Sequence, residues 1–160
     1  MKKITASLLG LAMMGAMMAP VHADETTTTL KYTKTSEYTL SIPATIIVSS
    51  VNETEQAIGV SAVNTNATDK VQISVKSGVG SDGKVTLNRT GTGTGVTTEV
   101  TASLTSKGSG IGANEVISEF QDQSTTPTKG GKLFFSAIPA DALAGSYEGT
   151  IVFTASVVNR

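Results

Sequence analysis

The sequence predicts an all-β protein, an antiparallel sandwich of about eight to ten short strands. Apolar and polar residues alternate in several separate segments, which is the pattern of strands that are buried on one face. From residue 24 onward, 40 of the 137 residues are Ser or Thr, and the β-branched Thr suits the exposed face of a sheet. In addition, no segment of about ten residues has the 3.6-residue period of an amphipathic helix.

The N-terminal segment, residues 1–23, has the three parts of a secretory signal peptide. Lys2 and Lys3 supply positive charge, residues 4–19 are apolar or small, and small residues precede a cleavage site after Ala23. The apolar run is shorter than the roughly 20 residues that a membrane-spanning helix needs. We therefore predict cleavage after Ala23 and a secreted protein, extracellular or on the cell surface, with no membrane segment after cleavage.

The chain that remains is weakly acidic. It keeps all 13 acidic residues and loses only Lys2 and Lys3 of the 12 basic ones, so its net charge is about -3. Because neutralised phosphates supply most of the affinity for nucleic acid, a chain without a basic cluster is not expected to bind it. Its length suits one domain with its own core. We assign residues 24–36 to an N-terminal strand or arm and residues 37–160 to the sandwich domain.

The predicted strands follow one another between polar or glycine-rich links. The clearest alternation lies in residues 37–42, 71–76, 99–104, 133–137 and 147–157, with weaker strands at 46–51, 58–63, 85–87 and 116–120. The segment 147–157 is predicted as one continuous closing strand, with Tyr147, Gly149, Ile151 and Phe153 on one face. A single helical turn is predicted at 141–144. Without a Cys–Trp–Cys core, this pattern predicts an immunoglobulin-like β-sandwich in architecture only, with an up-and-down barrel as the alternative.

The residues needed for the common catalytic mechanisms are missing. The only histidine, His22, lies in the signal peptide, and the chain has no cysteine, which excludes Ser–His–Asp and Cys–His nucleophiles and ordinary zinc sites. The carboxylates are scattered, and there is no tryptophan to stack on a sugar ring, which disfavours a glycosidase. The oxygen-rich loop with Asn64, Asn66 and Asp69 does not match a calcium loop. We predict a protein that is not an enzyme and has no cofactor or metal.

Two motifs carry a resemblance to a known family. Residues 37–45, EYTLSIPAT, resemble the YTVTIPA opening of many small secreted Gram-positive surface proteins, and residues 144–153, AGSYEGTIVF, resemble their AGTYTGTITF closing strand. A similar closing strand occurs in WxL-type cell-wall-binding proteins, although a chain without tryptophan lacks the WxL motif itself. The resemblance implies a surface or extracellular β-sandwich and implies no catalytic residues.

The closing strand also resembles the ends of some bacterial pilin subunits, including fimbrial types without cysteine. Residues 24–36 precede the domain that the two motifs bracket, with Leu30 and Tyr32 alternating against threonines. We expect this segment to be an ordinary first strand. The alternative is an arm that completes a neighbour's sheet by strand addition.

Two functional hypotheses follow from these observations. The first is a non-enzymatic surface module for adhesion, which binds a cell-wall polymer, a glycan or a host protein through the loops at 90–95, 107–112 and 121–131. The second is a pilin-like structural subunit that self-associates through residues 24–36. The sequence shows neither a lipobox cysteine nor an LPxTG-type sorting signal, so we expect no covalent anchor.

Overall fold

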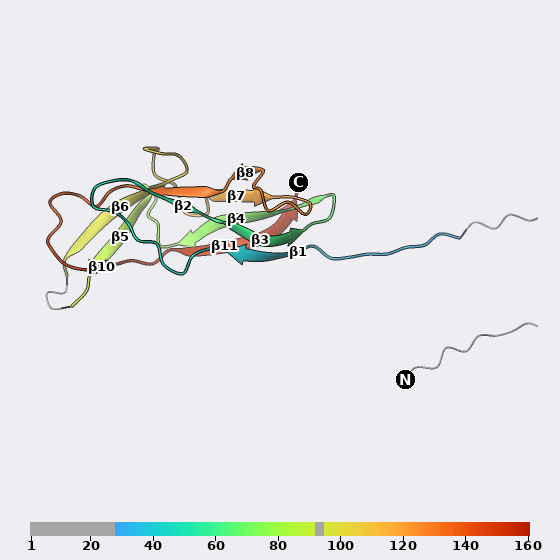
Figure 1. Ribbon diagram of the computed structural model, residues 1–160, viewed down its shortest axis with the longest axis horizontal. Coiled ribbons are helices and arrows are strands. Elements are labelled where there is room, and N and C mark those ends of the chain that lie inside the picture. Colours follow the sequence, from blue (N-terminus) through green and yellow to red (C-terminus); the bar gives the residue numbers. More distant parts are fainter. Residues whose placement is uncertain (1–27, 92–94) are drawn as a thin grey trace, which may run out of the picture. The chain divides into compact units, whose positions relative to one another are not determined.

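The computed structural model describes residues 28–91 and 95–160 (Figure 1). The predicted signal peptide and its cleavage after Ala23 lie outside the described residues, as does the part of segment 24–36 before Thr28. By its contacts the chain divides into two units, residues 1–32 and residues 33–160. Within the described ranges, no helix has the length and apolar character needed to cross a membrane.

The regular structure of the described residues consists of β-strands, as the sequence predicts. Eleven strands form in this part of the chain, and two of them, β8 and β10, have only two residues each. Their bounds are β1 (Glu37–Ser41), β2 (Thr54–Ala57), β3 (Gly59–Asn64), β4 (Asp69–Ser77), β5 (Lys84–Arg89), β6 (Thr97–Ser103), β7 (Val116–Phe120), β8 (Lys129–Gly130), β9 (Lys132–Phe135), β10 (Tyr147–Glu148) and β11 (Val152–Asn159).

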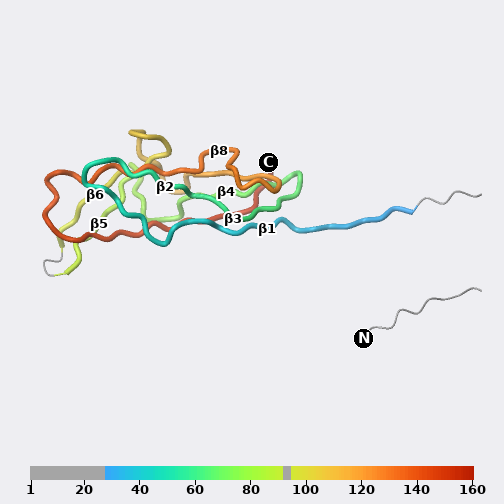
Figure 2. Tube along the Cα trace, in the orientation of Figure 1, coloured from blue at the N-terminus to red at the C-terminus, as the bar shows by residue number. Residues whose placement is uncertain are grey.

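These strands form antiparallel sheets that pack as a sandwich. In the described ranges, one sheet has the order β10-β5-β6-β9-β2, a second has the order β11-β4-β7-β8, and a third consists of β1 and β3. The chain passes from β2 into β3 through Ile58 alone, so the first and third sheets share one continuous segment (Figure 2). The predicted antiparallel β-sandwich is therefore confirmed.

The core lies between the sheets and follows from the alternating pattern. Every second residue of β4, namely Val71, Ile73 and Val75, is buried, as the sequence alternation predicts. The side chains that complete the core come from strands of all three sheets and from three residues outside the strands, Ile58, Val79 and Ile111; the strand residues are Val60, Val63, Val85, Leu87, Val100, Ala102, Ile117, Phe120, Leu133 and Phe135. Burying one large apolar side chain is worth about 1.5–3 kcal/mol, so this set supplies the main driving force for folding.

The predicted continuous closing strand is wrong in one respect, because it divides between two sheets. Its first part, β10, pairs with the end of β5, whereas its second part, β11, pairs with β4. The chain runs on between them through residues 149–151 (Figure 1). A Cβ at Gly149 would lie 2.6 Å from the Thr86 carbonyl oxygen, so the crossing needs glycine. The alternation continues through the crossing, and Ile151 and Phe153 still pack against the core.

Two other predictions are wrong. Residues 46–51 form no strand: Ile46 and Val48 pack against the core, but among the described contacts their backbone finds no partner strand. The helical turn predicted at 141–144 is instead a turn over residues 139–142, closed by a hydrogen bond from the Ala142 N–H to the Pro139 carbonyl at 3.1 Å. The short strands β2 and β8 were not predicted, because their few residues are mostly polar.

Candidate functional site

The edge strands β1 and β11 lie side by side in Figure 1 and come from different sheets. In the described part of the chain, β1 pairs only with β3 and β11 pairs only with β4. The Tyr38 hydroxyl donates a 2.9 Å hydrogen bond to the Ala155 carbonyl, which links the two edges. The sandwich therefore presents two adjacent edges on this side.

The apolar rows on these two strands are only half covered. Val157 lies opposite Val71 in the register, yet Val157 is 37% exposed and Val71 is 0% exposed. In the same way Leu40 lies opposite Val60, and their exposed fractions are 42% and 7%. Directly opposed residues share one face of a sheet, so the difference arises because the edge residue lacks a neighbour on its outer side. We call this partly open row the edge slot, and it consists of Tyr38, Leu40, Phe153, Ala155 and Val157.

The outer edge of β11 has few of the features that usually block strand pairing. Soluble proteins protect such edges with Lys, Pro, inward-pointing charges or bulges. From Val152 to Val158 the strand VFTASVV has no charge and no proline. Its single irregularity lies between Val152 and Phe153, at the end where the strand begins. The remainder of β11 is therefore a regular edge on which another strand can pair.

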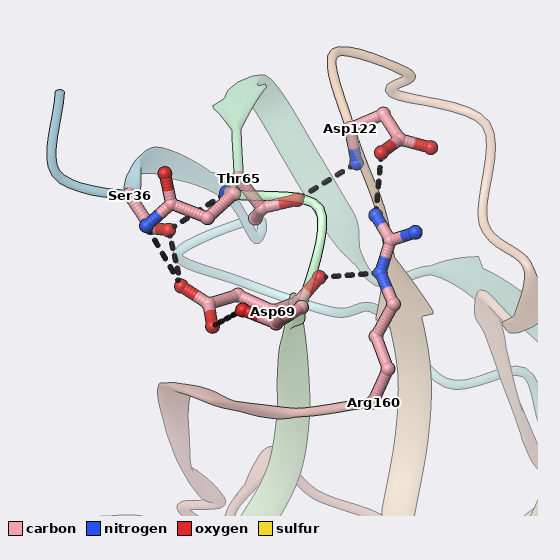
Figure 3. A network of polar contacts seen from close by, with 7 residues as sticks. Ser36, Thr65, Asp69, Asp122 and Arg160 are labelled. Atoms are coloured by element: carbon pink, nitrogen blue, oxygen red, sulfur yellow. Dashed lines mark hydrogen bonds and ion pairs between the residues drawn. The ribbon is translucent and has the colours of Figure 1, made fainter. Parts of the chain in front are cut away.

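A network of polar contacts holds the residue before β1 in place, and Figure 3 shows it from close by. The Ser36 hydroxyl donates to the Asp69 carboxylate at 2.7 Å and accepts the Asn66 N–H at 3.0 Å. The Arg160 Nε donates to the Asp69 carbonyl at 2.7 Å, and its guanidinium also pairs with the Asp122 carboxylate. We call these five residues the polar clamp. It joins four segments that are far apart in the sequence.

The carboxylate of Asp69 is the centre of the polar clamp. Its pKa lies below the ordinary value chiefly because the Ser36 hydroxyl donates a hydrogen bond to it. Desolvation opposes this shift, whereas hydrogen bonds from Asn66 and Thr68 and the charge of Arg160 add to it. Asp69 is therefore ionised at neutral pH, and the clamp is formed by the ionised carboxylate.

The clamp predicts how stability depends on pH. A carboxylate whose pKa is depressed by folding contributes stability above its unfolded pKa of about 3.9, and that contribution is lost as the pH falls through the lower folded value. We expect the Asp69 carboxyl carbon to titrate below the ordinary range in an NMR titration. Ser36→Ala should raise the midpoint more than Thr68→Ala, which removes a weaker donor. A wild-type Asp69 that titrates at the ordinary value would contradict the clamp.

A second feature is an open groove of about 1250 Å³, which shares Phe153 with the edge slot. Its walls include Ile46, Leu87, Phe135 and Ile151, and polar and charged groups such as Arg89 stand among them. The sequence places ligand contacts in the loops at 90–95, 107–112 and 121–131. Of the residues in those loops, only Thr90 lines the groove in the described part of the chain.

The predicted site residues fall into two groups. The expectation that residues 24–36 form an ordinary first strand is wrong for the described part, because residues 28–36 form no strand; there the side chains of Leu30 and Tyr32 are 93% and 87% exposed. The closing-strand residues Gly149, Ile151 and Phe153 line the groove together with Tyr147. The Tyr147 hydroxyl also donates to the Leu143 carbonyl at 2.8 Å.

Sequence reasoning missed the edge slot and the polar clamp. The absence of charged residues in β11 is a signal for an open edge that the sequence contains. The strand order that puts β11 at an edge depends on pairing between distant segments, and the residues of β11 do not reveal it. The clamp residues, at 36, 66, 69, 122 and 160, carry no common motif and meet only through the fold.

The acidic residues form no metal-binding cluster in the described ranges. There, no group of three or more His, Cys, Asp or Glu side chains is placed to hold a metal ion. Glu119 is mostly buried and accepts hydrogen bonds from Lys70 at 3.0 Å and Gln72 at 2.8 Å. Burial raises its pKa, but these hydrogen bonds and the neighbouring lysine charges outweigh burial, and the net pKa is lowered. Such a carboxylate stays ionised at neutral pH and is suited to a structural role rather than to acid catalysis.

Fold and site together define a class, a β-sandwich with two adjacent open edge strands and an exposed apolar pair, Leu30 and Tyr32, ahead of β1. Comparisons of the chain with protein-family models, with curated proteins and with solved structures find no match.

Proposed function

We propose that this protein is a secreted, non-enzymatic structural subunit that assembles with copies of itself by strand addition through residues 24–36. The observation that carries the proposal is the state of Leu30 and Tyr32, which are 93% and 87% exposed in a segment without a strand. Burying each of these side chains is worth about 1.5–3 kcal/mol. A segment that leaves both in water is suited to a partner that covers them.

The sequence of the segment supports pairing as a strand. Thr is its most frequent residue, and Leu30 and Tyr32 are two positions apart, so they lie on the same face of an extended chain. Peptides that add to a sheet edge gain affinity from main-chain hydrogen bonds and specificity from alternate side chains. The resemblance of the closing segment to the ends of pilin subunits supports the same proposal.

The rest of the chain supports a role outside catalysis and outside the cell. After the predicted cleavage the protein has neither histidine nor cysteine. The predicted signal peptide supports export, and assembly with other copies would retain the protein at a cell surface.

Deletion of residues 28–35 tests the proposal and leaves Ser36 in the polar clamp. We expect the protein from Asp24 onward to form oligomers whose size rises with concentration in sedimentation velocity, and the deletion variant to stay monomeric. Because the segment forms no strand in the monomer, the deletion should leave the urea midpoint unchanged. A matched variant, Leu30→Thr with Tyr32→Thr, keeps the chain length and should also lose assembly.

Two results would oppose this proposal. A protein with the intact segment that stays strictly monomeric at high concentration rules out self-assembly. Binding of the monomeric deletion variant to cell-wall material or to a glycan array would instead favour the surface-binding hypothesis. The groove of about 1250 Å³ is the structural feature that supports this second candidate function, the binding of a cell-wall polymer or a glycan.

A further inference from the structure

We infer that the edge slot is the acceptor for residues 28–35 of a second copy, whose Leu30 and Tyr32 complete its apolar row. This inference rests on the proposed function and adds the surface to which the segment binds. The added strand pairs with the outer edge of β11 and enters between β11 and β1. Each copy then offers one donor segment and one acceptor slot, so contacts of this head-to-tail kind can continue along a fibre.

The lengths of donor and acceptor agree. The strand β11 has eight residues, and in the described part of the chain only β4 pairs with it. The donor segment 28–35 also has eight residues, which span about 26 Å at 3.3 Å per residue in an extended chain. Apart from the bulge between Val152 and Phe153, the register of β11 with β4 is regular, so its other edge can accept a strand over most of this length.

The side chains of the two surfaces are also complementary. On β11 the residues Phe153, Ala155 and Val157 recur at every second position; Phe153 and Ala155 pack against the core, and Val157 lies opposite the buried Val71. In a strand added beside them, Leu30 and Tyr32 lie on the same inward face. Leu40, which is 42% exposed on β1, would then be covered from its open side.

The charges permit this arrangement. The donor carries Lys31 and Lys34, and β11 has no charged residue from Val152 to Val158. In the added strand Lys31 lies on the opposite face from Leu30 and Tyr32 and stays in water. Lys34 shares the face of that pair, but it lies at the end of the donor segment, where it forms an ion pair with Glu37. No like charge on β11 therefore opposes the lysines.

The donor has to come from another copy because the chain lacks a turn at the required place. To pair with its own β11 beside β1, the segment would have to reverse its direction within residues 33–36. Tight reversals use Gly, Asn, Asp, Pro or Ser, and of these the stretch Thr-Lys-Thr-Ser offers only Ser36. In addition, the hydrogen bonds of Ser36 to Asp69 and Asn66 already hold the last residue of that stretch.

In the single copy, the side chain of Tyr38 occupies one hydrogen-bonding position on the outer edge of β11. Its hydroxyl donates to the Ala155 carbonyl at 2.9 Å, an acceptor that an added strand would otherwise use. Strand addition replaces this one side-chain hydrogen bond by several main-chain hydrogen bonds and buries Leu30 and Tyr32. The exchange therefore favours the assembled state over the single copy.

Disulfide trapping tests the acceptor directly, because the chain has no cysteine of its own. Lys31→Cys is mixed with a second protein that carries Ser156→Cys, an exposed position on the outward face of β11. The control acceptor is Thr86→Cys, an exposed position that lines the groove. We expect mild oxidation to give the mixed dimer with Ser156→Cys, at least tenfold above the yield with Thr86→Cys. Crosslinking that favours Thr86→Cys would place the acceptor in the groove and overturn the inference.

A complementation experiment separates the acceptor from the proposed function. Val157→Lys puts a charge into the edge slot, whereas Ser156→Lys puts the same charge on the outward face of β11. A Val157→Lys protein keeps its donor segment, and the protein without residues 28–35 keeps its slot. Each alone should be monomeric, and an equimolar mixture should form a one-to-one dimer that grows no further. Urea unfolding of both proteins checks that they are folded.

The possible failures are distinguishable. If Val157→Lys still forms long oligomers while the deletion variant does not, the segment assembles but the slot is not its acceptor. If the unmodified protein does not assemble at any concentration, the proposed function itself fails. If Ser156→Lys abolishes assembly as completely as Val157→Lys, the slot-facing side chains do not decide the binding, and the inference is wrong.

Discussion

Phe135→Ala is expected to lower the free energy of unfolding by about 3–5 kcal/mol, because it removes a buried aromatic ring and leaves a cavity. Phe135 is buried on β9 at the point where it lies opposite Ala102 of β6 and Thr54 of β2. Strands on both sides hold the backbone there, so the surroundings have little freedom to collapse into the space. Urea unfolding of both proteins at the same pH measures the difference.

The neighbouring residue provides a matched control for that substitution. Phe134 lies on the same strand with its side chain on the other face, where it is only half-buried. Phe134→Ala removes the same ring and should cost about 1 kcal/mol, within the range of ordinary substitutions. Equal losses from the two variants would show that the core is not on the face that the burial pattern indicates.

Gly110→Ala is expected to destabilise the domain by about 2–3 kcal/mol, since overpacking against a fixed backbone forces it to move. A Cβ at this position would lie 1.9 Å from the Asp82 carbonyl oxygen and 2.7 Å from the Gly83 Cα. The close approach belongs to a junction in which Gly110 bridges Ser103 and the Ala102 N–H donates to the Gly83 carbonyl at 2.8 Å. Thermal unfolding followed by calorimetry measures the loss.

Gly112 is the control for this glycine, because it is two residues away in the same loop. A Cβ at Gly112 meets nothing within 4 Å, and its φ is not in the left-handed region. Gly112→Ala should therefore leave the melting temperature nearly unchanged or raise it slightly by restricting the unfolded chain. A melting temperature that falls equally in both variants would mean that the loop backbone, and not the contact at Gly110, sets the stability.

The sequence predicts the fold class and most strands because alternation is a local property. Segments such as 71–76 and 85–87 have one buried face, and that face is visible in the residue order. The segment 46–51 has the same local signal, and it fails because its backbone has no partner strand. Whether a partner exists depends on the path of distant segments, which alternation does not record.

The candidate site was less predictable than the fold for the same physical reason. The sequence alone singles out Leu30 and Tyr32 as candidate binding residues, because they are an alternating apolar pair that precedes the domain. The edge slot was not visible, because Val157 and Leu40 become half-exposed only through the order of strands in two sheets. Contacts over long sequence separations, such as that of Ser36 with Asp69, likewise appear only in the folded chain.

The crossing of the chain between β10 and β11 has a consequence for how the domain unfolds. Residues 149–151 join the five-stranded sheet to the four-stranded sheet through covalent backbone, and the chain has no disulfide to do so. The crossing packs closely against both sheets: a Cβ at Gly149 would collide with the Thr86 carbonyl oxygen of β5, and a Cβ at Gly78, which follows β4, would collide with the Thr150 carbonyl oxygen. Neither sheet can then open far without disturbing the other, so amide protons in both should exchange in a single cooperative event.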